Sequence, residues 1–263
     1  MLGAIIGDIA GSRFEWDNIK SKEFELFTDR CRPTDDSIMT LAVAQAILKN
    51  CEGDPDRLGA EAVNCMQTLG RKYPAAGYGG RFRRWLFTYD PVPYHSFGNG
   101  AAMRVSPCAW AAGSLEDAKA MARAVTEVTH DHPEGLKGAE AAVCAVYLAL
   151  HGSGIPEIRA HISENYYPLD FTLDEIRPDY SFDVSCQGSV PQAITAFLES
   201  TGFEDAIRNA ISIGGDSDTI AAIAGGIAGA FYGVPEGLRS QVLRFLDANQ
   251  ENILNRFEER FGK

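Results

Sequence analysis

Apolar residues recur along most of this chain at the three- and four-residue spacing of helices, with no segment that alternates as a strand would. The clearest case is the run 220–232, where Ile220, Ile223 and Ile227 share one face and small residues occupy the opposite one. A helix with no polar face is predicted to be buried. The whole pattern predicts eight to eleven helices in one all-α domain spanning residues 1–263. The main predicted helices are 37–50, one that opens at Pro55 and runs toward Gly70, one that follows a capping box at Ser114 and runs up to Thr129, 134–150, 203–213, 220–232 and one that opens at Pro191.

Three segments have a different pattern. Residues 1–10 are apolar but contain Gly3 and Gly7, which fits either a short strand or a buried glycine-rich helix that contacts another backbone. Residues 73–99 are rich in glycine, proline and aromatic side chains and are predicted to be the longest irregular stretch, a natural place for binding. Residues 166–186 are polar and aromatic and are predicted to form a loop.

Composition narrows the possible functions. The formal charge is −12 and the pI is near 4.9, which argues against a broad nucleic-acid surface because such surfaces use Lys and Arg to neutralise phosphates. Asp8 interrupts the first apolar run, so no signal peptide is predicted, and no stretch reaches the roughly 18 apolar residues of a membrane helix. The six cysteines lie far apart and predict reduced, mostly buried thiols in a cytoplasmic protein.

Two distant segments place carboxylates and hydroxyls where an apolar helix begins: Thr34-Asp35-Asp36 and Asp216-Ser217-Asp218-Thr219. If the helix starts face each other, four carboxylates converge, and such hard oxygen ligands suit Mg²⁺, Mn²⁺ or Ca²⁺. We expect a pair of ions that share one aspartate. Each cluster alone could instead be an N-cap, because Ser, Thr and Asp are preferred capping residues. An EF-hand is excluded, since Ala221 and Ile227 stand where that loop needs Gly and Glu.

Five motifs, in order, resemble those of the ADP-ribosylglycohydrolase family, which includes the dinitrogenase reductase-activating glycohydrolase and the ADP-ribosylarginine and ADP-ribosylserine hydrolases. The resemblance covers essentially the whole chain. It implies the family's compact, all-α orthogonal bundle. The motifs are Gly3 to Gly11 with Glu15, Thr34-Asp35-Asp36, Ser96-Phe97-Gly98-Asn99-Gly100-Ala101-Ala102-Met103-Arg104, Thr129-His130, and Gly215 to Thr219.

The resemblance also implies a binuclear Mg²⁺ or Mn²⁺ centre. Glu15 matches a glutamate on a flap that approaches the metal or substrate, so Glu15, Asp35 and Asp36 become the candidate catalytic carboxylates. Which of them serves as the base stays open. The positions that match the family's metal ligands are Thr34, Asp35 and Asp36 for one ion, Asp216 and Thr219 for the other, and Asp218 as the bridge.

For the substrate, the resemblance implies an ADP-ribosylated protein or another ADP-ribose conjugate, cleaved at the anomeric carbon of the distal ribose. The glycine-containing loop matches the segment that cradles the diphosphate and distal ribose, where backbone N–H groups can approach phosphates. His130 matches a histidine of the substrate pocket. The loop residues expected to contact the substrate are Ser96, Phe97, Gly98, Asn99, Gly100, Met103 and Arg104.

Two other functions remain open. Clustered aspartates with two cations also serve phosphohydrolases of free nucleotides, and some relatives of this family look like structural lens crystallins. The linkage to arginine nitrogen, serine oxygen, a nucleic-acid end or a small molecule is open as well. Asp8 fits either a supporting role behind the metal ligands or a hydrogen bond to a helix start. Tyr180 and Phe182 fit either packing or a platform for adenine. The arginines at 81, 83 and 84 fit either a solvated face or contact with an acidic target or the phosphates.

Overall fold

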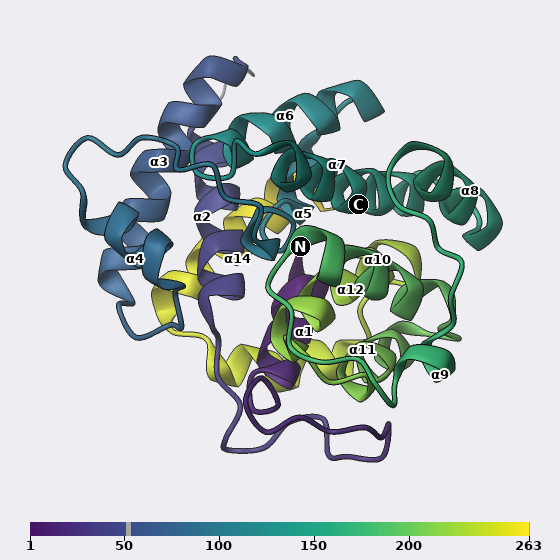
Figure 1. Ribbon diagram of the computed structural model, residues 1–263. Coiled ribbons are helices and arrows are strands. Elements are labelled where there is room, and N and C mark those ends of the chain that lie inside the picture. The colour runs from purple at the N-terminus through teal and green to yellow at the C-terminus, as the bar shows by residue number, and fades with distance from the viewer. Residues whose placement is uncertain (51–53, 263) are drawn as a thin grey trace.

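The computed structural model describes residues 1–50 and 54–262, and Figure 1 shows them as helices joined by loops. These residues contain fourteen α-helices and two short 3₁₀ helices, and their β-type pairing is limited to an isolated bridge between Gly98 and Ser185. The all-α prediction is confirmed. Within the described part, no helix is long and apolar enough to cross a lipid bilayer. The elements are α1 (Leu2–Gly11), α2 (Asp35–Lys49), α3 (Pro55–Lys72), α4 (Gly80–Phe87), η1 (Asn99–Ala101), α5 (Ser106–Ala111), α6 (Leu115–Glu127), α7 (Pro133–Leu150), α8 (Ile155–Asn165), α9 (Leu173–Ile176), α10 (Cys186–Leu198), α11 (Phe203–Ser212), α12 (Ser217–Phe231), α13 (Glu236–Val242), η2 (Leu243–Phe245) and α14 (Ala248–Phe261).

The centre of the molecule is the pair α1 and α12, which run antiparallel with their backbones in contact (Figure 1). A methyl group on Gly7 would lie less than 3.0 Å from the carbonyl oxygen of Ala221, and one on Gly3 would meet that of Gly225 equally closely. Only glycine therefore allows this approach. Residues 1–10, for which strand and helix were both open, form the buried glycine-rich helix that meets another backbone.

Other helices surround this pair. α2 packs against α1, α3 and α14, while α7, α10 and α11 pack against α12. Ile38, Met39 and Leu41 point to different sides of α2 and are all buried, so this helix lies in the interior of the protein. Because α1 contacts both α2 and α12, its C-terminal half lies where those two helices begin.

Two short helices occupy segments that were predicted to be irregular. α4 lies inside 73–99, where Phe82, Trp85 and Leu86 are buried at the three- and four-residue spacing of one helix face. α9 lies inside 166–186 and begins with a capping box between Thr172 and Glu175. Such short helices bring the total above the predicted eight to eleven, because one or two turns hold too few positions for a periodic pattern to be recognised in the sequence.

Two predicted helix starts are wrong. The helix expected to open at Pro191 begins at Cys186, because the Ser185 hydroxyl accepts a hydrogen bond from the Gly188 N–H (3.1 Å) and caps an earlier turn. Pro191 lies inside that helix, where its φ is compatible and one backbone hydrogen bond is lost. Likewise α2 begins at Asp35 rather than 37, so both aspartates of the first cluster belong to its first turn.

The cysteines within the described residues are free and buried, as predicted; they are Cys31, Cys65, Cys108, Cys144 and Cys186. The prediction for Cys51 falls outside the described residues.

Candidate metal and substrate site

The two acidic clusters meet at the start of α2 and α12. The Thr219 hydroxyl donates a hydrogen bond to Asp36 Oδ2 (3.2 Å), which joins segments 183 residues apart in sequence. Asp36 and Asp218 are buried, with 2% and 3% of their surface exposed. The facing arrangement on which the metal hypothesis depended is therefore present.

Asp8 of α1 holds the first cluster in place. Its Oδ2 accepts hydrogen bonds from the backbone N–H groups of Thr34 (2.9 Å) and Ser37 (3.0 Å), and its Oδ1 accepts one from the Thr34 hydroxyl (2.5 Å). The Ser37 hydroxyl also donates to Asp8. Asp8 therefore fits both hypotheses from the sequence. It accepts hydrogen bonds at the start of a helix, and it also lies among the clustered carboxylates.

The second cluster follows a sharp turn. Gly214 and Gly215 have φ of +72° and +76°, a region that glycine adopts without strain. Asp216 occupies the N-cap position of α12 but makes no side-chain capping hydrogen bond. Its Oδ2 instead accepts a hydrogen bond from the Asn99 side chain (2.6 Å), which links the cluster to the glycine-containing loop. Capping alone does not account for this aspartate.

The carboxylates form two overlapping groups that could hold a cation. Oxygens of Asp8, Asp36 and Asp218 lie within 4.8 Å of one another, and so do those of Glu15, Asp216 and Asp218. Asp218 belongs to both groups. Within the described residues, none of the five carboxylates in the two groups forms an ion pair, although a buried charge is costly without a partner.

A divalent cation fits the donor set. Asp36 Oδ1 is buried and has no hydrogen-bond partner, so one strong acceptor in the centre of the cluster is unsatisfied by the protein. The surrounding donors are carboxylate and hydroxyl oxygens, which favour hard ions such as Mg²⁺ or Mn²⁺. Neither carboxylate group contains histidine or cysteine, which agrees with the oxygen-only hypothesis from the sequence.

The electrostatics of the cluster favour protonation when no cation is bound. Burial, together with the nearby Asp8 carboxylate, raises the pKa of Asp35 to about 8. Burial and the Asp216 carboxylate raise the pKa of Glu15 to about 7. Burial also raises the pKa of Asp36 and Asp218 well above the usual range for aspartate. The site therefore needs either protons or cations to neutralise it.

Asp35 stands apart from the two carboxylate groups. It is only partly buried, and its backbone N–H donates to the carbonyl of Ala76 (2.8 Å). A methyl group on Gly77 would lie 3.1 Å from Asp35 Oδ1, so the segment that follows α3 closes over this carboxylate. Of the predicted ligands, Asp35 is therefore the most peripheral to the shared cluster.

Glu15 is brought to the cluster by the connector 12–34. Asn18 in this connector is tied to the turn before α12, and the Lys20 ammonium donates to the carbonyls of Ile213 and Tyr180, both at 2.5 Å. The ring of Trp16 stacks on Phe182 with centroids 4.9 Å apart. Sequence reasoning missed Asn18 and Lys20, because polar residues in a turn-rich connector give no periodic signal.

The loop 96–104 divides into two parts. Ser96 to Gly100 lies at the site: the Asn99 N–H donates to the Val184 carbonyl (2.7 Å), and the ring of Phe97 is 46% exposed. Met103 and Arg104 are buried, with 5% and 1% of their surface exposed. The two halves of this motif thus have different surroundings, which the sequence alone did not reveal.

His130 lies behind the glycine-containing half of this loop. A methyl group on Gly100 would be 3.4 Å from His130 Nε2, and one on Gly98 would be 3.6 Å from it. Burial, followed by the charges of Arg104 and Arg81, lowers the pKa of His130 well below its usual value, so the ring is neutral. Tyr180 packs against the turn before α12: a methyl group on Gly215 would lie less than 3.0 Å from the Tyr180 ring, and the Tyr180 hydroxyl donates to the Gly188 carbonyl (2.7 Å).

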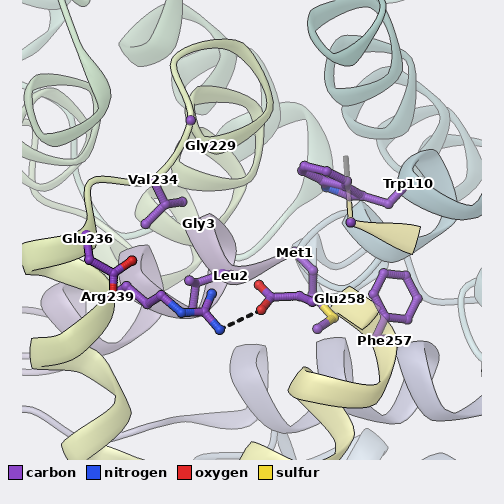
Figure 2. Close-up of a pocket in the computed structure, with 12 residues that line it drawn as sticks. Met1, Leu2, Gly3, Trp110, Gly229, Val234, Glu236, Arg239, Phe257 and Glu258 are labelled. Carbon is purple, nitrogen blue, oxygen red and sulfur yellow. Dashed lines mark ion pairs between the residues drawn. The ribbon is translucent and has the colours of Figure 1, made fainter. Parts of the chain in front are cut away.

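A separate cavity of about 540 Å³ lies at the opposite end of α1 (Figure 2). Figure 2 shows Trp110, Val234 and Phe257 around it, with an ion pair between Arg239 and Glu258 (2.7 Å). Because these charges are paired and the acidic cluster lies at the other end of the helix, the cavity is not part of the candidate site.

The chain matches the family model for ADP-ribosylglycohydrolase over residues 1–262. It is 28% identical to the ADP-ribosylhydrolase ARH3 of Xenopus tropicalis, with 89% of this chain and 86% of that protein covered. It is 26% identical to the ADP-ribosyl-(dinitrogen reductase) glycohydrolase of Rhodospirillum rubrum, over 85% of this chain and 76% of that protein. A solved ADP-ribosylglycohydrolase-related protein complex shares the fold, with a TM-score of 0.70, 24% identity and coverage of 100% of this chain and 96% of that one.

Proposed function

Since the chain belongs to the ADP-ribosylglycohydrolase family, we propose that it hydrolyses the glycosidic bond between ADP-ribose and a modified protein side chain. The names of its relatives support the substrate class, since they include an ADP-ribosylhydrolase and an ADP-ribosylarginine hydrolase. The observation that carries the proposal is that Asp218 belongs to both carboxylate groups, so that its carboxylate could be shared if each group held an ion.

The metal part of the proposal assigns two Mg²⁺ or Mn²⁺ ions to the cluster. Bound there, they would supply Lewis-acid binding of ribose hydroxyls and would lower the pKa of a coordinated water. Among residues 1–50 and 54–262, Asp36 Oδ1 has no hydrogen-bond partner and the clustered carboxylates form no ion pair, and both observations support this assignment. The residues that would hold the ions are Thr34, Asp35, Asp36, Asp216, Asp218 and Thr219.

Glu15 is proposed to move the proton at the scissile bond. Its carboxyl is half-buried beside Asp216, and in the metal-free protein burial and that carboxylate raise its pKa to about 7, so the surroundings favour proton uptake by Glu15. Its segment is held against the turn before α12 by Asn18, which fixes the carboxyl near the clustered aspartates. Asp36, in contrast, is buried and accepts a hydrogen bond from the Thr219 hydroxyl, and it would serve as a metal ligand.

The loop from Ser96 to Gly100 is proposed to hold the diphosphate and the distal ribose. Asn99 anchors this loop to Asp216, so that a ribose bound to the loop faces the carboxylates. Glycines at 98 and 100 let the loop backbone lie close to the His130 ring, which an added methyl group at either position would contact. A neutral histidine and backbone amides suit an acidic protein, which has few cations to offer a diphosphate.

The decisive experiment is a panel of defined substrates with ADP-ribose linked to arginine or to serine, together with free ADP-ribose, each incubated with and without Mg²⁺. Release of intact ADP-ribose from a protein conjugate, dependent on metal, is expected. Release of AMP from free ADP-ribose would instead support a phosphohydrolase. Absence of turnover on every substrate, with metal bound, would support a non-enzymatic crystallin-like role.

A further inference from the structure

Arg104 is a buried cation without an anionic partner. Its side chain is 1% exposed, and no ion pair to it occurs in residues 1–50 and 54–262. Its Nη2 donates to the Thr129 hydroxyl (2.6 Å) and more weakly to the Val125 carbonyl (3.4 Å). A guanidinium buried in this way is costly, so its placement calls for an interaction that uses it. Its strongest hydrogen bond goes to Thr129.

The Thr129 hydroxyl lies between Arg104 and His130 and connects them by hydrogen bonds. Its Oγ1 lies 2.7 Å from His130 Nδ1 and accepts the hydrogen bond from Arg104 at the same time. The other possible acceptor for the hydroxyl proton is the Thr126 carbonyl at 3.3 Å, which already accepts the backbone N–H groups of Thr129 (3.1 Å) and His130 (2.8 Å). The hydroxyl proton is therefore directed to His130 Nδ1.

A second contact points the same way. Arg104 Nη2 lies 3.5 Å from His130 Nδ1, so a positively charged donor faces that nitrogen directly. A proton on Nδ1 would oppose this donor, whereas a lone pair there is attracted to it. We propose that Arg104 is a positioning residue that, through Thr129, fixes His130 in the tautomer with its proton on Nε2.

This tautomer determines what His130 can bind. Nε2 faces Gly98 and Gly100 and makes no hydrogen bond within the described residues. It is thus a neutral donor aimed at the loop that is proposed to hold the diphosphate and ribose, and it selects a ligand atom that accepts, such as a hydroxyl or phosphate oxygen. This consequence rests on the proposed function, whereas the tautomer itself does not.

The charged and titratable groups around the ring are consistent with a neutral His130. Arg104 and Arg81 both disfavour its protonation, and the neighbouring Tyr94 ring, 5.9 Å away between centroids, has a pKa raised by burial to about 12. No carboxylate within the described residues pairs with the ring, in contrast to His95, which lies 3.8 Å from Asp131. Because the ring is neutral, Thr129 and Arg104 affect only which of its two neutral tautomers is populated.

The tautomer can be measured without any substrate. Protein labelled with ¹⁵N in its five histidines is examined by long-range proton–nitrogen correlation NMR, and His130 is assigned by comparison with His130→Asn. We expect protonated Nε2 and unprotonated Nδ1 in the wild type and in Thr129→Ser, which keeps the hydroxyl. Thr129→Val and Arg104→Met are expected to shift His130 toward a mixture of tautomers.

Two results would overturn the proposal: a wild-type His130 protonated on Nδ1, or a Thr129→Val spectrum identical to that of the wild type. Comparing Thr129→Val with Thr129→Ser keeps the test valid if Arg104→Met does not fold, because valine is nearly isosteric with threonine.

Calorimetric titration with ADP-ribose and Mg²⁺ then tests whether the His130 tautomer affects ligand binding. A mixture leaves only part of the protein with Nε2 protonated, so binding by Thr129→Val should weaken in proportion to that fraction, about twofold for equal populations, with Thr129→Ser close to wild type. If wild type does not bind ADP-ribose, the proposed function fails while the NMR result still decides the tautomer.

Discussion

The side chain of Asn18 and the backbone of Gly215 exchange two hydrogen bonds: the Gly215 N–H donates to Oδ1 (2.7 Å) and Nδ2 donates to the Gly215 carbonyl (2.9 Å). Gly215 lies in the turn just before Asp216, and Asn18 lies three residues after Glu15. One side chain therefore sets the position of the Glu15 segment relative to the second acidic cluster.

Asn18→Ala should weaken this link without removing any predicted ligand. Loss of the pair is expected to lower the free energy of unfolding by about 1–2 kcal/mol and to reduce kcat more than ADP-ribose affinity, because Glu15 is then held less firmly. Thermal unfolding and steady-state kinetics measure both effects. Asn165→Ala is the matched control, since that side chain bonds only within its own helix, to the His161 carbonyl. Equal kcat in both variants would contradict the assignment.

Glu15→Gln separates proton transfer from binding. The amide keeps the size of the side chain but cannot exchange a proton, so kcat is expected to fall by about 10²–10⁴-fold. Titration with ADP-ribose should give an affinity close to that of the wild type. A variant that retains full kcat would remove Glu15 from the reaction.

Asp218→Asn should have opposite effects on the metal-free and metal-bound protein. Without metal the substitution removes a buried carboxylate whose pKa is raised by burial and by Asp36, so the apparent Tm at neutral pH should rise. The ability of Mg²⁺ to raise the Tm should be lost, with affinity for both ions reduced by more than about 100-fold. Calorimetry gives the stoichiometry. Asp170→Asn, at an exposed position, should keep two ions and the wild-type response.

The stability of the metal-free protein should decrease as pH rises from about 4.5, just above the pKa of unfolded carboxyls, to about 8. The folded-state pKa values of Glu15 (about 7) and Asp35 (about 8) lie above those of unfolded carboxyls, so the folded state binds more protons in this window. Stability from such groups is present at low pH and is lost as pH rises through the folded pKa. Mg²⁺ should therefore raise the Tm more at pH 8.5 than at pH 6. Thermal scans with EDTA or Mg²⁺ test this, and a metal effect that is constant with pH would contradict it.

Gly7→Ala should destabilise the central helix pair. The added methyl would fall less than 3.0 Å from the Ala221 carbonyl, so the helices must separate, at a cost of at least about 2 kcal/mol. Gly237→Ala is the matched control in an exposed helix, where a methyl meets nothing within 4 Å; its helix propensity predicts a stabilisation of up to about 1 kcal/mol. Chemical denaturation distinguishes the two.

Part of this structure could be predicted from the sequence. Helical periodicity identified the long helices, and hydroxyls with aspartates at the start of α2 and α12 identified the acidic cluster. Pro191 misled the prediction because the capping hydroxyl of Ser185 determines the helix start and proline only has to fit. The hydrogen bond between Asn99 and Asp216 could not be predicted from the sequence. The two residues are 117 positions apart, and their contact depends on how the helices pack and leaves no local pattern.

The backbone contact between α1 and α12 fixes which face of α1 is turned toward α12, and therefore the direction in which Asp8 and the residues after it point. A residue inserted between Gly7 and Gly11 would turn everything beyond it by about 100° and move it by about 1.5 Å, so glycine would no longer face α12. Substitutions that enlarge or shrink distant core side chains leave this rotation of α1 relative to α12 unchanged. The length of this segment is therefore expected to tolerate change far less than its side chains do, and insertions should be accommodated in the connector 12–34 instead.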